Sequence, residues 1–338
     1  MDLLHPGYLD ITCSPKTKPA MPTLSIISCR MLEDEIVHLL SSDSEVKELL
    51  LLDGKENQSL SRKLKSQNRP HILLAWESIG SHLQEKQSRP GGLLSRLGIR
   101  SSPAKGIMVV VSLLRLGLHS DLELLRNEVY DEIRRMSAFS DGILIFYGRC
   151  GDFLAHIQED LADLSCPLYF LADGKGQRID DCIATALGGN EEYDRTLSEH
   201  KDVAVFLTPM WASSWRAMRE EIASSGSGRD LRAMLKGTGL KRVAGIDTGL
   251  TFEKGFEEKV DGFAREFGLE RIDLPGGTRV AEKSYERAKS SLLAAEAGRA
   301  PLTDESLRLK SSWSREPIVS LCRVAWKRIA GLSGQQKE

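Results

Sequence analysis

Short runs of apolar residues alternate along the chain with segments whose apolar positions recur at helical spacing. The first run, residues 24–28, is followed after Cys29 by apolar residues at 32, 36, 39 and 40, the spacing of one face of an amphipathic helix. Further runs of strand length lie at residues 48–53, 107–114, 142–148, 167–172, 203–209, 242–249 and 270–277. Helical patterns separate most of these runs. The pattern therefore predicts strands that alternate with helices.

Such alternation predicts an α/β fold, with a mostly parallel sheet and helices on both of its faces. The run at residues 107–114 is nearly continuous in branched apolar residues, as expected of a strand that is covered on both sides. The pattern leaves open whether the strands form one wide sheet or two abutting lobes.

The predicted core domain spans residues 23–297. Residues 1–22 contain four prolines and no periodic pattern, so we predict a poorly ordered extension there. Residues 55–106 end in a stretch rich in Gly, Pro, Ser and Arg, and we interpret this region as an insertion or flap. Its arginines either meet an anionic partner or belong to a solvated loop. Residues 298–338 are predicted to form a linker and a C-terminal helix.

Composition excludes several classes of protein. The net charge is −2, with 28% charged and 41% hydrophobic residues, so no basic excess indicates a nucleic-acid surface. No apolar stretch approaches the roughly 20 residues that span a bilayer. The N-terminus lacks a basic segment followed by an apolar one, so we expect a cytoplasmic protein. In that compartment the six cysteines are expected to be thiols, metal ligands or core residues rather than disulfides.

Candidate chemistry gathers where the predicted strands end. In parallel sheets, ligands bind outside the carboxyl ends of the strands, on loops that the scaffold holds in place. Four residues with soft or nitrogen donor atoms follow such strands: Cys29, His119, Cys150 in a Gly-x-Cys-Gly corner, and Cys182. Their positions in the predicted fold, and not their long-range spacing, indicate a shared site.

Three thiols and one imidazole form a tetrahedral ligand set for zinc, and three thiols alone would leave the fourth position open. Thiolates also suit an iron–sulfur cluster or a thiol redox site. The structural alternatives are that each cysteine is a small buried residue, and that His119 is hydrogen-bonded at a helix start.

Other polar and aromatic residues on the same predicted edge are candidates for catalysis or cofactor binding. Glu35 and Asp181 either orient a ligand or exchange protons, or they are a solvated helix face and a helix cap. Arg178 is a third catalytic candidate, and the residues predicted to line a cofactor are Tyr147, Trp211 and Asp247. Trp211 is interpreted as the wall of a pocket or part of the core, and the alternative is a recognition platform.

Familiar catalytic motifs are absent from the sequence. The Walker loop, a GxGxxG after a strand, the GxSxG elbow and HExxH do not occur. The DTG at residues 247–249 lacks the second copy that an aspartic protease needs, and the DxHxxG of a corrinoid-binding module is missing. The sequence motifs therefore indicate no particular reaction.

Seven short segments, in order, carry a resemblance to a known family. They read ISCRMLEDE, GLHSDLELL, LIFYGRCG, RIDDCIATALGG, EEYD, FLTPMW and GIDTGL, and the resemblance extends from about residue 24 to 289. Together they resemble the domain-of-unknown-function family 1638 of methanogenic archaea and anaerobic bacteria. The matching positions are Cys29, Leu32, Glu35, Leu118, His119, Tyr147–Gly151, Arg178–Ile183 and Thr208–Trp211.

The resemblance implies a context but no reaction, because genes of this family often neighbour corrinoid-dependent methyltransferase systems. The chain departs from the family pattern in residues 55–106, in a proline missing after the Leu-His pair, and in a longer loop before Arg178. We expect a zinc-binding protein of corrinoid-dependent one-carbon metabolism, and whether it is an enzyme stays open. Its expected partner is a corrinoid protein or a methyltransferase. The alternatives are a non-catalytic accessory or chaperone module and an iron–sulfur or thiol redox protein.

Overall fold

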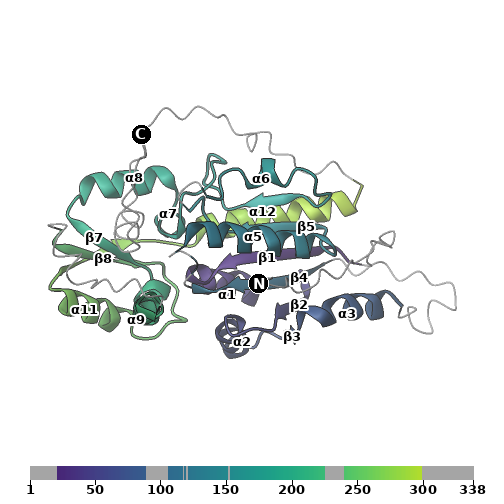
Figure 1. Cartoon of the computed structure of the whole chain (residues 1–338), viewed down its shortest axis with the longest axis horizontal. Coiled ribbons are helices and arrows are strands. Elements are labelled where there is room, and N and C mark those ends of the chain that lie inside the picture. The colour runs from purple at the N-terminus through teal and green to yellow at the C-terminus, as the bar shows by residue number, and fades with distance from the viewer. Residues whose placement is uncertain are drawn as a thin grey trace, which may run out of the picture.

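The computed structural model describes residues 21–88, 106–116, 118, 121–150, 153–224 and 240–298. The fold is α/β, as predicted, and its strands form two separate parallel sheets (Figure 1). The predicted extension up to residue 20 and the predicted C-terminal helix lie outside the described residues. So does the arginine-rich part of the predicted flap, residues 89–105.

Six strands form the first sheet, and every neighbouring pair is parallel. In spatial order they are β3 (Ile72–Leu74), β2 (Val46–Leu52), β4 (Ile107–Leu114), β1 (Thr23–Cys29), β5 (Gly142–Phe146) and β6 (Leu168–Phe170). The central strands β1, β4 and β5 are buried along their whole length, as their continuous apolar runs require.

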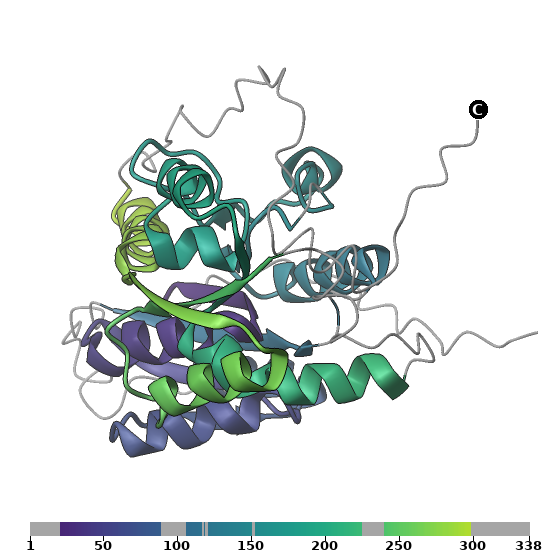
Figure 2. The same cartoon turned by 90° about the vertical axis from the view of Figure 1, so that its left-hand side faces the viewer.

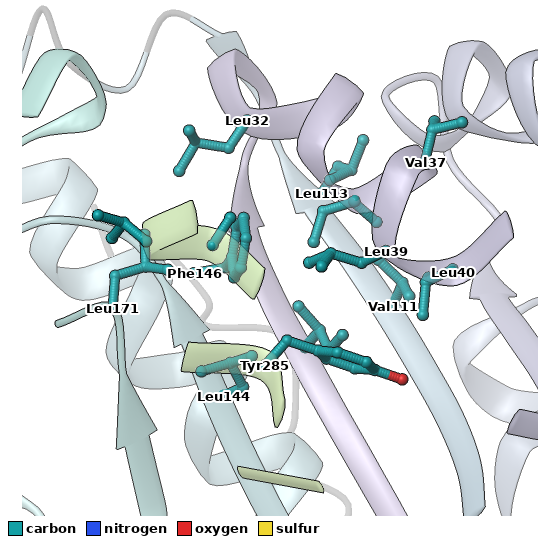
Figure 3. Close-up of a cluster of buried hydrophobic side chains, with 14 of the residues drawn as sticks. Leu32, Val37, Leu39, Leu40, Val111, Leu113, Leu144, Phe146, Leu171 and Tyr285 are labelled. Atoms are coloured by element: carbon teal, nitrogen blue, oxygen red, sulfur yellow. The ribbon is translucent and has the colours of Figure 1, made fainter. Parts of the chain in front are cut away.

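Helices cover both faces of this sheet. On one face α1 (Glu33–Ser42), α2 (Asn57–Ser66) and α12 (Arg279–Glu296) share an apolar core with alternate strand residues. Figure 3 shows part of it, including Leu39, Val111, Phe146 and Tyr285. On the other face α5 (Leu122–Ser137) and α3 (Trp76–Ser88) pack against the intervening strand residues. The side-chain period of two in a strand makes this division.

Three strands form the second sheet: β7 (Val203–Leu207), β8 (Arg242–Asp247) and β9 (Glu270–Pro275). The helices α9 (Pro209–Ser224) and α11 (Phe256–Phe267) pack on it around Trp215, Phe263 and Phe267. Figure 1 shows this sheet at the left, and Figure 2, seen from that side, places it in front of the first sheet. The sequence pattern left open whether the strands form one wide sheet or two lobes, and the structure has two separate sheets.

The chain passes from the first sheet to the second and then returns to the first. Within the first sheet, the short helix α6 (Ile157–Asp160) lies between β5 and β6. After β6 the chain forms α7 (Cys182–Leu187) and α8 (Asn190–Glu199), whose apolar side chains join the first core to residues of β7 and β8. After β9 it returns as α12, which packs against the first sheet. One continuous core therefore holds both sheets together.

The region interpreted as an insertion or flap belongs in part to the sheet itself. Its helix α2 packs on the first core, and its strand β3 pairs with β2 through Leu50 to Leu52. Residues 72–74 form this strand at the edge of the sheet, and α3 begins directly afterwards at Trp76. Within the described residues, no helix has the length and apolar character that crossing a membrane requires.

The order of the strands marks a place for ligands. Strands β1 and β4 are neighbours, yet the chain leaves β1 toward β2 on one side and leaves β4 toward β5 on the other. These two connections run over opposite faces of the sheet, through α1 and α5, and the crevice at the carboxyl ends of two such neighbouring strands is the usual ligand site of open α/β sheets. Cys29 is the last residue of β1, so it stands at this point.

Candidate functional site

Cys29 and Tyr147 lie side by side at the carboxyl ends of β1 and β5. Ser28 pairs with Phe146, so the next residue of each strand is Cys29 and Tyr147, and both point to the face that α5 covers. Cys29 is 5% exposed, and this burial raises the pKa of its thiol to about 12. Its Sγ accepts a hydrogen bond from the backbone N–H of Met31 at 3.4 Å. The thiol is therefore neutral unless a cation approaches it.

Cys150 adopts a backbone conformation that is rare for a residue with a side chain. Its φ is +46°, which costs on the order of 1 kcal/mol and is found mostly where function or tight packing requires it. Burial raises the pKa of its thiol well above the ordinary value, and Cys29 adds to this effect. A hydrogen bond from the Gly148 backbone opposes the rise. Cys150 and Cys29 are thus close enough to influence each other electrostatically.

The corner that carries Cys150 is fastened to the segment before α7. The Cys150 N–H donates to the Asp180 carbonyl at 3.0 Å, and the Arg149 N–H donates to the Ile179 carbonyl at 2.8 Å. Gly148 permits this approach, because a Cβ there would lie 2.6 Å from the Asp180 carbonyl oxygen. These contacts bring Cys150 beside the start of α7, where Cys182 is the first residue.

Asp181 caps α7 and so fixes the position of Cys182. Its Oδ1 accepts the N–H groups of Ile183 and Ala184, each at 2.9 Å, as an N-cap aspartate does. The Tyr193 hydroxyl donates to Oδ2 at 3.3 Å. Of the two roles that the sequence left open for Asp181, these contacts are those of a helix cap.

Trp211 brings the second sheet into contact with Cys182. It lies in the first turn of α9, directly after β7, and its Nε1–H donates to the Cys182 Sγ at 3.2 Å. The indole also packs against apolar residues of the first sheet, so it forms a wall between the two sheets.

The three predicted sulfur ligands contact one apolar cluster on the α5 side of the first sheet. We call Cys29, Cys150 and Cys182 the thiol cluster. Within the described residues, however, no three Cys, His, Asp or Glu side chains are arranged so that they could hold a metal ion. His119, the predicted fourth ligand, lies outside the described residues. The structure thus brings three thiols to one region without assembling a coordination sphere.

Glu35 is buried in the first turn of α1, near enough to Cys29 to raise the pKa of that thiol. It is 3% exposed, so the alternative of a solvated helix face is wrong. Burial, together with the neighbouring Asp34, raises the pKa of Glu35 to about 8. Its Oε2 has no hydrogen-bond partner within the described part of the chain. A carboxyl group in this state is protonated at neutral pH and acts as a proton donor.

Beside Glu35 lies a charged cluster that the sequence reasoning missed. The ammonium group of Lys63 is surrounded by carboxylates of Glu33, Asp34 and Glu253. Burial raises the pKa of Asp34 to about 6, although Lys63 opposes this. Three consecutive acids at the start of a helix were the available signal, but they are usually explained by the helix dipole. Lys63 itself lay in the region interpreted as an insertion.

Arg178 and Asp247 have structural partners. The Arg178 guanidinium donates to the carbonyls of Leu154 and Ala155, both at 2.9 Å, and stacks on Phe170. Burial lowers the pKa of Arg178 to about 10. The exposed Asp247 ends β8 in the second sheet, where its Oδ1 accepts the Gly249 N–H at 2.8 Å. Arg178 therefore shapes the loop next to Cys150, while Asp247 stabilises a turn.

One family model matches the chain, over residues 113–285, slightly more than half of its length. That family is described as a protein of unknown function, DUF1638. The match contains Cys150, Cys182 and Trp211, whereas Cys29 and Lys63 precede it. No curated protein and no solved structure matches the chain.

Proposed function

The chain belongs to the DUF1638 family of proteins of unknown function, and from its thiol cluster we propose that it binds a soft metal ion, zinc before others. The ligands are Cys29, Cys150 and Cys182, and His119 either completes the shell or stands beside it. With three sulfur ligands, the fourth position is open to water or to a substrate thiol.

The observation that carries the proposal is that every sulfur of the thiol cluster accepts an N–H hydrogen bond. Cys29 accepts from Met31, Cys182 from Trp211, and Cys150 from the Gly148 backbone. Such donors favour a thiolate over a thiol, and they surround metal-bound sulfur as an outer shell. Burial keeps the thiols of Cys29 and Cys150 protonated, so a bound cation is what would deprotonate them.

Metal binding requires the thiol cluster to close around the ion. Rotation of cysteine side chains between their staggered positions moves the sulfur atoms while the backbone stays in place. The backbone positions are fixed by the Asp181 cap, the pairing of residues 148–150 with 179–181, and the end of β1. Each thiol releases its proton to solvent as a metal bond forms; Glu35, close to Cys29, already holds a proton at neutral pH and therefore adds no negative charge beside the thiolate.

We extend the proposal to thiol activation for methyl transfer. A zinc ion lowers the pKa of a bound thiol and presents it as a thiolate nucleophile. The place of this chemistry in corrinoid-dependent one-carbon metabolism, with a corrinoid protein or methyltransferase as partner, comes from the family resemblance alone. We also propose a cytoplasmic location, because thiol ligands stay reduced there.

Metal analysis of anaerobically purified protein tests the proposal. We expect about one equivalent of zinc in the wild type and a loss of most of it in Cys150→Ser and Cys182→Ser. Cys166→Ser is the matched control, because Cys166 is another buried thiol but lies before β6. Less than about half an equivalent of any metal in the wild type, unchanged in Cys150→Ser, contradicts metal binding.

The same preparation distinguishes the other two interpretations. Charge-transfer absorption in the visible spectrum, with iron in the metal analysis, identifies an iron–sulfur protein instead of a zinc protein. A metal-free protein that still binds a corrinoid protein in a pull-down is a non-catalytic accessory module. Both outcomes replace the zinc proposal.

A further inference from the structure

Lys63 is a buried cation between three carboxylates. Its Nζ lies 2.9 Å from Glu33 Oε1, 2.7 Å from Asp34 Oδ1 and 2.6 Å from Glu253 Oε1. The lysine side chain is 11% exposed, while Glu33 and Asp34 are almost fully buried. Because water screens these buried charges little, the attraction between the Lys63 ammonium group and the carboxylates is strong.

The partners of Lys63 come from both sheets. Lys63 itself lies in α2, and Glu33 and Asp34 begin α1, so these three residues belong to the first sheet. Glu253 lies between β8 and α11 of the second sheet. The Lys63 Nζ is also 3.1 Å from Met210 Sδ, at the start of α9. Lys63 therefore joins the two sheets at one point.

Lys63 is connected to the thiol cluster through residues of both the first and the second sheet. Met210 precedes Trp211, the residue whose indole N–H donates to Cys182. Glu33 and Asp34 follow Cys29 by one short turn, η1 (Arg30–Leu32). A displacement of α9 away from α2 would move Trp211 away from Cys182, because Met210 and Trp211 are adjacent in one helical turn.

We propose that Lys63 is a positioning residue that holds the start of α9 against the first sheet, so that Trp211 donates to the Cys182 sulfur. In the absence of Lys63, Glu33, Asp34 and Glu253 repel one another, and the second sheet loses its ionic contact with α1 and α2. The wall that Trp211 forms then loosens. The effect on metal affinity rests on the proposed function, but the effect on Cys182 does not.

The experiment measures how fast Cys182 reacts with iodoacetamide in full-length, chelator-treated protein, with the modified residue identified by mass spectrometry. We expect Lys63→Met to accelerate alkylation of Cys182 by about tenfold, as the loss of one hydrogen bond to the sulfur predicts. Lys63→Arg keeps a cation at this place and restores part of the protection. Alkylation of Cys166 is the internal reference and stays unchanged.

A second variant separates a specific effect from general destabilisation. Lys289 also contacts three carboxylates, Asp43, Glu45 and Glu286, at 2.8, 3.0 and 2.9 Å. Asp43 and Glu45 lie between the end of α1 and the start of β2, far along α1 from Glu33 and Asp34. Lys289→Met should therefore leave the alkylation of Cys182 unchanged. An equal acceleration in Lys289→Met overturns the proposal.

Combination with Trp211→Phe tests the route of the effect. If Lys63 acts through the indole, Trp211→Phe accelerates alkylation of Cys182 by itself, and Lys63→Met adds little to it. Independent, multiplying effects contradict the proposal. Should Lys63→Met fail to fold, Glu253→Gln removes only the negative charge that the second sheet places beside Lys63, and the same expectation holds with a smaller acceleration. An unchanged Cys182 in that variant counts against Lys63, whether or not the wild type binds zinc.

Discussion

The buried carboxyl group of Glu35 makes a specific prediction about stability and pH. Its pKa is about 8 in the folded protein, against an ordinary value of 4.5, because burial disfavours the charged form. Between these two pH values the folded protein keeps a proton that the unfolded chain has lost. The folded state therefore binds more protons, and stability falls as the pH rises through this window. Below pH 4.5 Glu35 contributes no pH dependence.

The magnitude follows from the size of the window. One proton corresponds to a slope of at most about 1.4 kcal/mol per pH unit, so the whole shift corresponds to about 5 kcal/mol between pH 4.5 and 8. Glu35→Gln keeps the shape of the side chain and removes the ionisable group. We expect the variant to gain stability relative to wild type as the pH rises, with the largest difference at about pH 8 to 9.

Urea unfolding of chelator-treated protein from about pH 5 to pH 9 measures this difference. Asp34 has a raised pKa of about 6, so it adds a slope of the same sign that both proteins share. The informative quantity is therefore the difference between the free energies of unfolding of variant and wild type. Glu296→Gln, an exposed change in α12, is the control and should give a flat difference. A flat difference for Glu35→Gln as well would refute the reasoning that burial keeps Glu35 protonated.

Three further changes test the corner and the loop beside it. Gly148→Ala places a Cβ 2.6 Å from the Asp180 carbonyl oxygen, so urea unfolding should show a free energy of unfolding lower by about 2 to 3 kcal/mol, and metal binding should weaken. Unchanged stability would show that the backbone of residues 148–150 shifts freely. Cys150→Gly relieves the backbone at φ +46° and should raise the free energy of unfolding of metal-free protein by up to about 1 kcal/mol. The same variant should lose zinc binding. A lower free energy of unfolding instead would show that the packing of the thiol outweighs the backbone strain. A lysine in Arg178→Lys cannot donate to two carbonyls in the fixed geometry of a guanidinium, so the rate of amide hydrogen exchange should rise in residues 153–155 and not in β1. Equal exchange rates in variant and wild type contradict the role of Arg178 in that loop.

The local pattern of the sequence determined the elements and much of their orientation. Strand-length apolar runs predicted the parallel α/β class, and Asp121, a residue type that favours helix starts, caps α5. The period of two along β1 and β5 also places Cys29 and Tyr147 on one face once the strands are paired. These features follow from neighbours in the sequence, so one chain suffices to predict them.

Only the tertiary structure decided how distant segments meet. The hydrogen bonds of Cys150 to Asp180 and of Trp211 to Cys182 depend on strand register and on the division into two sheets, which periodicity does not encode. The same holds for Lys63, which is an ordinary helical lysine until α1 and the β8–α11 loop surround it with carboxylates. Cysteines at strand ends were visible in the sequence, whereas the groups that set their protonation come from residues far along the chain, because burial and charge act through space.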